Sequence, residues 1–151
     1  MTPASLTLDE LIPPGHVFDR LRAADKSSLL LALARSAGEA LGLPPAEIAA
    51  ALAAREALGS TGIGAGIAVP HARMAALAAP TGFLARLDRP VAFEAVDGGP
   101  VDLVFLLLSP SADAAHLRAL AAVSRRLRMP GVAEAMRTAP SAGLRAALLG
   151  P

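Results

Sequence analysis

The sequence contains no cysteine, no tryptophan and no tyrosine among its 151 residues, and only four phenylalanines. Without cysteine there is no disulfide framework, no zinc–thiolate site and no thiol nucleophile. So few aromatic rings do not favour a base-stacking platform for single-stranded nucleic acid. The formal net charge is +1 and charged residues make up 18% of the chain, so neither a basic nucleic-acid surface nor an acidic tail is expected.

Long hydrophobic runs are also missing, although hydrophobic residues make up 54% of the chain. The longest runs, such as 101–108, are far shorter than the roughly 20 residues of a membrane-spanning helix. The opening residues MTPASLTLDE lack the basic start and apolar run of a signal peptide. We therefore expect a cytoplasmic protein without membrane insertion. The length predicts a single domain over residues 1–151, with the proline-containing residues 1–15 as a possible irregular arm.

Three longer helices are predicted from apolar residues at helical spacing. The first spans 26–42 after an Asp25 cap, the second spans 44–58 and opens with Pro44 and Pro45, and the third begins after Ser111 or Asp113. Prolines and glycines divide the remaining chain into two short helical pieces. The expected buried stripes are Leu29, Leu33, Ala37 and Ala40 in the first helix, Ile48 and Leu52 in the second, and Leu117, Leu120, Ser124 and Leu127 in the third.

Strands are predicted at 16–22, 67–69, 81–87 and 101–108. The last of these is apolar on both faces, which is typical of a central strand covered on both sides. Four glycines within residues 59–66 predict a loop before the second strand. Helices that precede, interrupt and follow the strands predict a layered α/β sandwich.

His71 is the first candidate for chemistry, because it lies where a strand meets a turn, directly after the glycine-rich segment. A neutral imidazole is a competent nucleophile toward phosphorus, and the P–N bond that it forms breaks readily, as a carrier requires. The alternative is a solvated loop histidine without a function, and His71 taken alone favours that alternative.

Arg55 and His116 could complete an anion site around His71. Arg55 falls on the apolar stripe of the second helix, where a guanidinium needs an anion or another partner. An arginine that extends to water at the helix end explains the position equally well. His116 lies near the start of the third helix, where backbone N–H groups favour a phosphoryl group. A boundary histidine without a role is the simpler interpretation of His116, and His16 is assigned no function.

The glycine-rich segment matches neither of the common nucleotide-binding patterns. The dinucleotide pattern G-x-G-x-x-G would need a glycine where Ile67 stands, and no Gly-Lys-Ser/Thr follows. The glycines therefore either allow close approach to a phosphate or a partner, or only make a tight turn. The histidine spacing fits no metal motif, and there is no G-x-S-x-G motif of a serine hydrolase.

The segments REALGSTGIG at 55–64 and GIAVPHAR at 66–73 resemble the phosphorylation-site segment of enzyme IIA domains of the bacterial phosphotransferase system. The similarity is to the fructose/mannitol type, and within it to the nitrogen-regulatory branch. It covers roughly residues 6–150, with departures at Ala65 and Met74. Further matching segments are 89–91 with Phe93, 96–97, 100–107, and His116-Leu117 with Leu120.

The resemblance implies a mixed, mostly five-stranded sheet with helices on both faces. It also implies that His71 accepts a phosphoryl group from a histidine-containing phosphocarrier protein, and that Arg55 and His116 hold this group. It implies no metal and no cofactor beyond the transient phosphohistidine. Backbone N–H groups of the glycine-rich segment are further candidates for phosphoryl contacts: Ser60, Thr61, Gly62, Gly64 and Gly66. An apolar docking patch near His71 is expected, with Ile63, Ile67 and Met74 at its rim.

Three functions are compatible with this resemblance. The first is a regulatory phosphocarrier of the nitrogen branch, which binds target proteins such as transporters or kinases differently in its two phosphorylation states. The second is a metabolic enzyme IIA that passes phosphate to a fructose- or mannitol-type sugar permease. The third is an interaction module without phosphotransfer. The absence of a fused permease domain favours the first over the second, and the presence of His71, Arg55 and His116 together speaks against the third.

Overall fold

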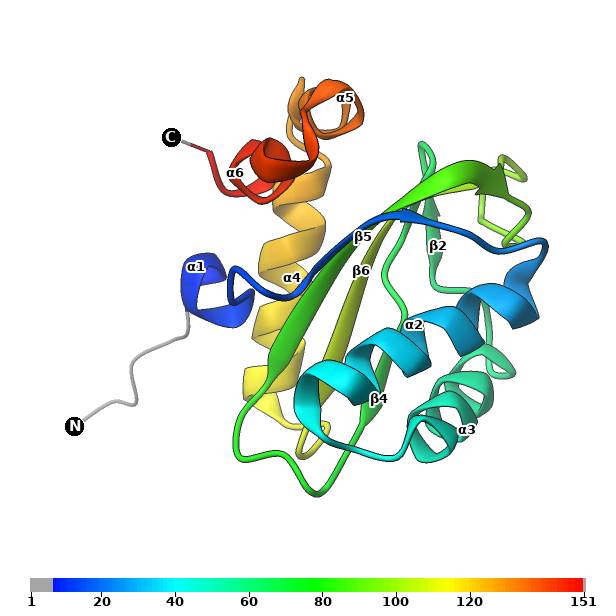
Figure 1. Ribbon diagram of the computed structural model, residues 1–151, viewed down its shortest axis with the longest axis vertical. Helices are drawn as coiled ribbons and strands as arrows, with labels where there is room; N and C mark the ends of the chain where they lie inside the picture. The colour runs from blue at the N-terminus through cyan, green and yellow to red at the C-terminus, as the bar shows by residue number, and fades with distance from the viewer. Residues whose placement is uncertain (1–6, 151) are drawn as a thin grey trace.

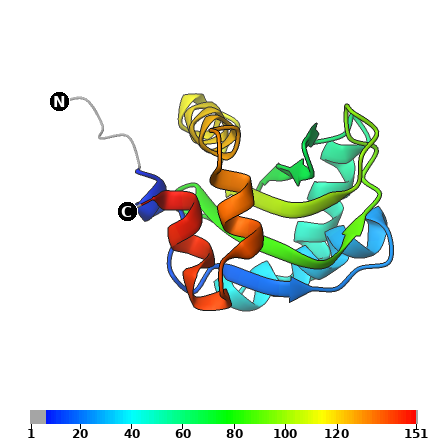
Figure 2. The same cartoon turned by 90° about the horizontal axis from the view of Figure 1, so that it is seen from above.

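The computed structural model describes residues 7–150 and places a mixed sheet between two layers of helices (Figures 1 and 2). The strand order is β1-β5-β6-β3-β2, and β4 also pairs with β6. β5 runs antiparallel to β6, whereas β1 is parallel to β5, and β3 and β4 are parallel to β6. The strands are β1 Val17–Leu21, β2 Gly62–Gly64, β3 Ile67–Ala68, β4 His71–Arg73, β5 Thr81–Val91 and β6 Val101–Ser109.

The predicted layered α/β fold is confirmed, although the sheet has six strands instead of five. Helices α2 and α3 pack against one face, and α1, α4, α5 and α6 pack against the other (Figure 2). Within residues 7–150, no helix is both long enough and apolar enough to cross a membrane. The helices are α1 Leu8–Leu11, α2 Lys26–Leu41, α3 Pro45–Glu56, α4 Ala114–Leu127, α5 Val132–Thr138 and α6 Leu144–Leu149, with a 3₁₀ turn at Ser141–Gly143.

The central strand β6 confirms the expectation of a strand buried on both faces. Alternate residues point to opposite sides of a sheet, and β6 supplies apolar side chains to both cores. Val104, Leu106 and Leu108 belong to the core under α2 and α3. Leu103, Phe105 and Leu107 belong to the core under α1 and α4–α6. The carboxyl end of β6 is thereby fixed from both sides, next to β4.

The buried stripe of α4 is confirmed at Leu127, and Leu120 is partly buried against the core, but the prediction is wrong at Leu117. Leu117 is 63% exposed, and the residues that face the sheet are His116, Val123 and Leu127. Asp113 caps the helix by accepting the backbone N–H groups of Ala115 and His116, which starts the helix with His116 toward the sheet. Leu117 follows about 100° further around the helix and therefore faces water.

The stripe of α2 is confirmed at Leu29, Leu33 and Ala37, but Ala40 is exposed. The buried stripe follows the 3.6-residue period and continues through Gly38, where a Cβ atom would lie 2.8 Å from the Leu43 carbonyl oxygen. The segment that follows α2 packs closely against Gly38, so the face of α2 that contains Gly38 is buried.

The expected irregular arm contains a short helix in its described part. The Thr7 hydroxyl accepts the Glu10 N–H, and the Glu10 carboxylate accepts the Thr7 N–H. These two hydrogen bonds form a capping box that starts α1. Leu11 is buried, and Arg145 of α6 donates to the backbone carbonyls of Asp9 and Ile12. Residues 1–6 of the expected arm lie outside the described residues.

The glycine-rich segment, predicted as a loop, contains an antiparallel hairpin formed by β2 and β3. The two turn residues Ala65 and Gly66 have φ angles of 56° and 80°, the positive values that a two-residue type I′ turn requires. Asp97 accepts the Ala65 N–H, and Arg137 of α5 donates to the Ala65 carbonyl. Contacts from two other segments therefore hold a non-glycine residue in this conformation.

A substitution at Gly62 in β2 tests whether the shape of this segment depends on close packing. A Cβ atom at Gly62 would lie 2.8 Å from the Ala95 Cβ and 2.9 Å from its Cα, and neither atom can rotate away. We expect Gly62→Ala to lower the free energy of unfolding by about 1–3 kcal/mol, measured by urea denaturation. Gly15→Ala is the control, because nothing lies within 4 Å of its added Cβ. Equal stability of the two variants would contradict this close packing.

Candidate functional site

His71 is the first residue of β4 and pairs with Leu107 of the central strand. Its ring is half-buried, and Nδ1 lies 2.9 Å from the Val69 carbonyl oxygen. A carbonyl oxygen only accepts hydrogen bonds, so the proton of the neutral ring is on Nδ1. The lone pair is then on Nε2, the nitrogen that can act as the nucleophile.

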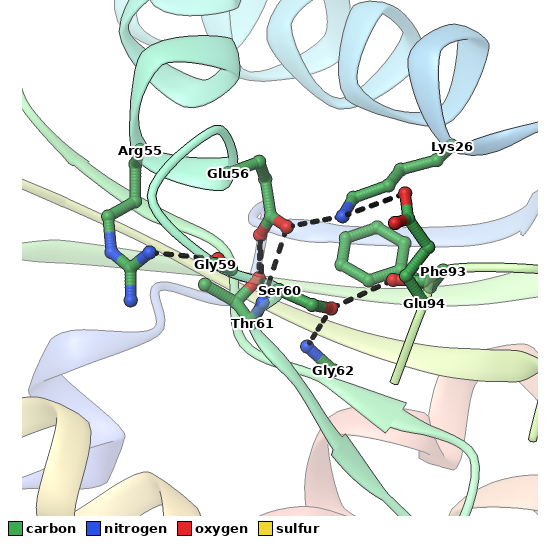
Figure 3. A network of polar contacts seen from close by, with 9 residues as sticks. All are labelled: Lys26, Arg55, Glu56, Gly59, Ser60, Thr61, Gly62, Phe93 and Glu94. Atoms are coloured by element: carbon green, nitrogen blue, oxygen red, sulfur yellow. Dashed lines mark hydrogen bonds and ion pairs between the residues drawn. The ribbon is translucent and has the colours of Figure 1, made fainter. Parts of the chain in front are cut away.

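Arg55 lies in the last turn of α3 and reaches this same nitrogen. Its Nε donates to Nε2 of His71 over 3.1 Å. Its Nη1 donates to the Gly59 carbonyl over 3.0 Å, the contact drawn in Figure 3. A guanidinium has donors only, which independently agrees with a lone pair on Nε2. Arg55 is half-buried and turned toward His71, so it does not simply extend into water.

His116, in the first turn of α4, completes the cluster. Its side chain is buried, and its ring centroid lies 5.3 Å from that of His71, with the rings tilted by 57°. Nδ1 of His116 lies 2.7 Å from the hydroxyl oxygen of Ser109, the last residue of β6. The fold therefore brings together the three residues singled out in the sequence, each from a different element.

The pKa of His71 is lowered below its usual value, chiefly because burial disfavours the charged imidazolium. The hydrogen bond to the Val69 carbonyl opposes this shift, while the positive charge of Arg55 adds to it and the negative charge of Glu56 opposes it. His71 is therefore neutral at pH 7, the form that a nucleophile needs. Burial also lowers the pKa of His116, and the neighbouring His71 lowers it further.

We expect the imidazole of His71 to titrate below the value of about 6.5 found in unfolded chains, as measured by NMR. Between the native and the unfolded pKa the unfolded state binds more protons, so stability falls as pH drops through this window. The same direction applies to His16 and His116, whose pKa values are also lowered by burial. A native pKa of His71 above the unfolded value would contradict the described environment.

The predicted phosphoryl contacts of the glycine-rich segment divide into two groups. The Ser60 hydroxyl donates to the Phe93 carbonyl and accepts the Gly62 N–H, and the Thr61 N–H donates to Glu56 (Figure 3). These contacts hold the segment after α3 and engage the Ser60 hydroxyl and the N–H groups of Thr61 and Gly62. The role of Ser60, Thr61 and Gly62 in binding a phosphoryl group stays a prediction.

Gly64 precedes the hairpin turn and Gly66 is its second residue, and both lie apart from His71. Next to this turn, β3 pairs with Leu103 of β6, whereas His71 pairs with Leu107, about 13 Å further along the strand. A Cβ atom at Gly66 would meet Arg137 and Asp102, and one at Gly64 would approach Asp97. The structure thus does not bring these two glycines to the cluster, and their role too stays a prediction.

Several residues of the cluster were not singled out in the sequence. The Val69 carbonyl and the Ser109 hydroxyl orient the two histidines. The only sequence signal for them was their position, since Val69 ends a predicted strand and Ser109 directly follows one. The expected docking rim is wrong for Ile67 and Met74, which are 2% and 7% exposed and belong to the cores. Within residues 7–150, no group of three or more His, Asp or Glu side chains could hold a metal ion.

The site is a histidine whose unprotonated Nε2 faces an arginine, with a second histidine beside it, on a layered α/β fold. Residues 10–143 match the family described as "Phosphoenolpyruvate-dependent sugar phosphotransferase system, EIIA 2". The chain therefore belongs to this family of enzyme IIA domains.

Within this family, the chain is similar to proteins named for nitrogen regulation. A "Nitrogen regulatory protein" of Bradyrhizobium diazoefficiens is 41% identical over 138 residues, which cover 91% of this chain and 90% of that protein. The structure of nitrogen regulatory protein IIA-Ntr from Neisseria meningitidis is 37% identical, with a TM-score of 0.83 over 92% of this chain and 97% of that one. IIA mannitol from Escherichia coli, 20% identical over 91% of this chain and 98% of that one, shares the fold with a TM-score of 0.75.

Proposed function

We propose that this protein is a phosphocarrier that accepts a phosphoryl group on Nε2 of His71 and acts as a regulatory enzyme IIA of the nitrogen branch. The observation that carries the proposal is the orientation of His71. Its Nδ1–H is bound to the Val69 carbonyl, so the Nε2 lone pair points toward Arg55. The donor is a histidine-containing phosphocarrier protein whose own imidazole carries the phosphoryl group.

The transfer exchanges one P–N bond for another. Nε2 of His71 attacks phosphorus, the bond to the donor imidazole breaks, and its electron pair returns to the donor nitrogen. Because His71 is neutral, the reaction needs no general base to create the nucleophile. Positioning and charge stabilisation then provide most of the rate enhancement, as in other phosphoryl transfers.

Arg55 has to exchange partners during this reaction. Its Nε now donates to the lone pair that attacks phosphorus, and this hydrogen bond cannot exist once Nε2 carries the phosphoryl group. The freed N–H then faces the anionic oxygens, a pairing that a guanidinium favours. The ring of His116, 5.3 Å from that of His71, supplies a further donor to the same oxygens.

Relatives named nitrogen regulatory protein match nine-tenths of this chain, which supports the regulatory branch. A "PTS system fructose-specific EIIA component" of Haloferax volcanii matches 60% of this chain. A role in sugar transport is therefore the alternative function. A doubly charged group on His71 would change the surface offered to a target protein. Onward transfer to a permease's cysteine domain separates the two functions, since the regulatory function does not require it.

Arg55→Met is expected to slow phosphoryl transfer by about 100-fold or more, because the variant loses the cationic donors that face the developing charge. Arg55→Lys keeps the charge but not the two separate donors, and should fall between Arg55→Met and the wild type. The rates are measured by quenched-flow with phosphorylated carrier protein. A wild-type rate in Arg55→Met would exclude Arg55 from the site.

The proposed function is tested with the wild-type protein, phosphoenolpyruvate, enzyme I and the phosphocarrier protein. Intact-mass spectrometry should show one added phosphate, which is lost in acid because phosphohistidine is acid-labile. Omission of the phosphocarrier protein is the control and should prevent the mass gain. A protein that gains no phosphate in the complete mixture is not a phosphocarrier.

A further inference from the structure

We propose that Ser109 is a positioning residue for phosphoryl transfer, because its hydroxyl fixes the tautomer of His116 that presents an Nε2–H to the phosphoryl group. This inference rests on the proposed function of the His71 cluster. Ser109 ends the central strand β6, and His116 lies in the first turn of α4. The two side chains meet in the interior, with the Ser109 hydroxyl oxygen 2.7 Å from Nδ1 of His116.

The direction of this hydrogen bond follows from burial. Ser109 is fully buried, and within residues 7–150 its hydroxyl has Nδ1 of His116 as its one hydrogen-bond partner. If Nδ1–H donated to Ser109, the hydroxyl proton would be left without an acceptor in the interior, which is costly. If the hydroxyl donates, its proton is satisfied, Nδ1 is the acceptor, and the proton of the neutral ring is on Nε2.

The resulting tautomer is the one that the reaction needs. A neutral His116 that donates from Nε2 stabilises phosphoryl oxygens on His71, whereas the other tautomer would turn a lone pair toward them. The two histidines therefore carry their protons on opposite ring nitrogens. The Val69 carbonyl holds the proton of His71 on Nδ1, and the Ser109 hydroxyl holds that of His116 on Nε2.

The tautomer is measured directly by ¹⁵N NMR of the unphosphorylated protein. Wild-type His116 should show a protonated Nε2 and an unprotonated Nδ1. Ser109→Ala should give averaged shifts of the two nitrogens, because the donor to Nδ1 is gone. Ser111→Ala is the matched control, since its hydroxyl, two residues away, donates to Asp113 instead of an imidazole. A single Nε2–H form in Ser109→Ala would overturn the proposal.

The kinetic test is a double-mutant cycle with His116. Ser109→Ala should slow transfer from the phosphocarrier protein by about tenfold, the effect of one hydrogen bond of ordinary strength. In a His116→Ala background the same change should have no further effect, because Ser109 acts through His116. An equal slowing in both backgrounds would mean that Ser109 only supports the fold, and would overturn the proposal.

Two further variants keep the test decisive. Ser109→Thr retains the hydroxyl and should restore the single tautomer. Ser109→Cys preserves volume with a weak donor, and replaces Ser109→Ala in every comparison if the alanine variant does not fold. If the wild-type protein takes up no phosphate, the proposed function fails, while the ¹⁵N measurement still decides whether Ser109 orients His116.

Discussion

Alanine in place of His71 is expected to abolish phosphoryl uptake, and no other single histidine substitution should do so. In the proposed transfer His71 supplies the attacking nitrogen, the Nε2 that faces Arg55, so its removal leaves no group in the cluster to form the P–N bond. His116 cannot replace it, because its ring is buried and Nδ1 is bound to Ser109. Intact mass after incubation with the phosphorylated carrier protein measures the result.

His16 offers a matched control for this prediction. Its Nδ1 also lies against a backbone carbonyl, that of Gly82, and burial also lowers its pKa. Its ring, however, is stacked on Phe83 with a centroid distance of 4.1 Å. His16→Gln should therefore retain full phosphate uptake, with some loss of stability. Undiminished uptake in His71→Ala would place the acceptor elsewhere in the chain.

Glu56→Ala is expected to cause the largest loss of stability among the variants considered, about 3–5 kcal/mol. The Glu56 carboxylate is only 5% exposed and lies 2.7 Å from the ammonium group of Lys26, which is 18% exposed. It also accepts hydrogen bonds from the backbone and the hydroxyl of Thr61 (Figure 3). Its removal leaves a nearly buried ammonium and a buried N–H without their acceptor.

Glu94 provides the comparison, because it approaches the same ammonium group from the surface. Its carboxylate is 3.9 Å from Lys26 and 84% exposed, so Glu94→Ala should change stability by less than about 0.5 kcal/mol. Urea denaturation measures both variants. Similar small losses for Glu56→Ala and Glu94→Ala would mean that the contacts of Glu56 do not hold the segment that follows α3.

Much of the fold could be predicted because local signals and tertiary packing agree. Asp25 caps α2 as its position predicts, and the two-sided apolar pattern of residues 101–108 identified the central strand. The failures arose where tertiary contacts decide. Leu117 is exposed because the cap at Asp113 sets the rotation of α4, and Ala65 takes part in a turn that Asp97 and Arg137 hold.

The candidate site was predictable in its residues but not in its protonation. Arg55 and His71 stood out through position and through the family motif, and the structure places them in contact. The nitrogen of His71 proposed to react is set by the Val69 carbonyl, and the tautomer proposed for His116 is set by Ser109. The residue types of Val69 and Ser109 do not reveal these roles, because a backbone carbonyl and a buried serine hydroxyl become partners of the histidines only through the tertiary fold.

The most direct test of the proposed function is to identify the phosphorylated nitrogen. Long-range ¹H–¹⁵N correlation spectra of the protein, labelled with ¹⁵N and phosphorylated by its carrier protein, distinguish the two nitrogens of each histidine ring. The described geometry predicts phosphorus on Nε2 of His71, with the proton retained on Nδ1 beside the Val69 carbonyl. Phosphorus on Nδ1 of His71, or on His16 or His116, would contradict it.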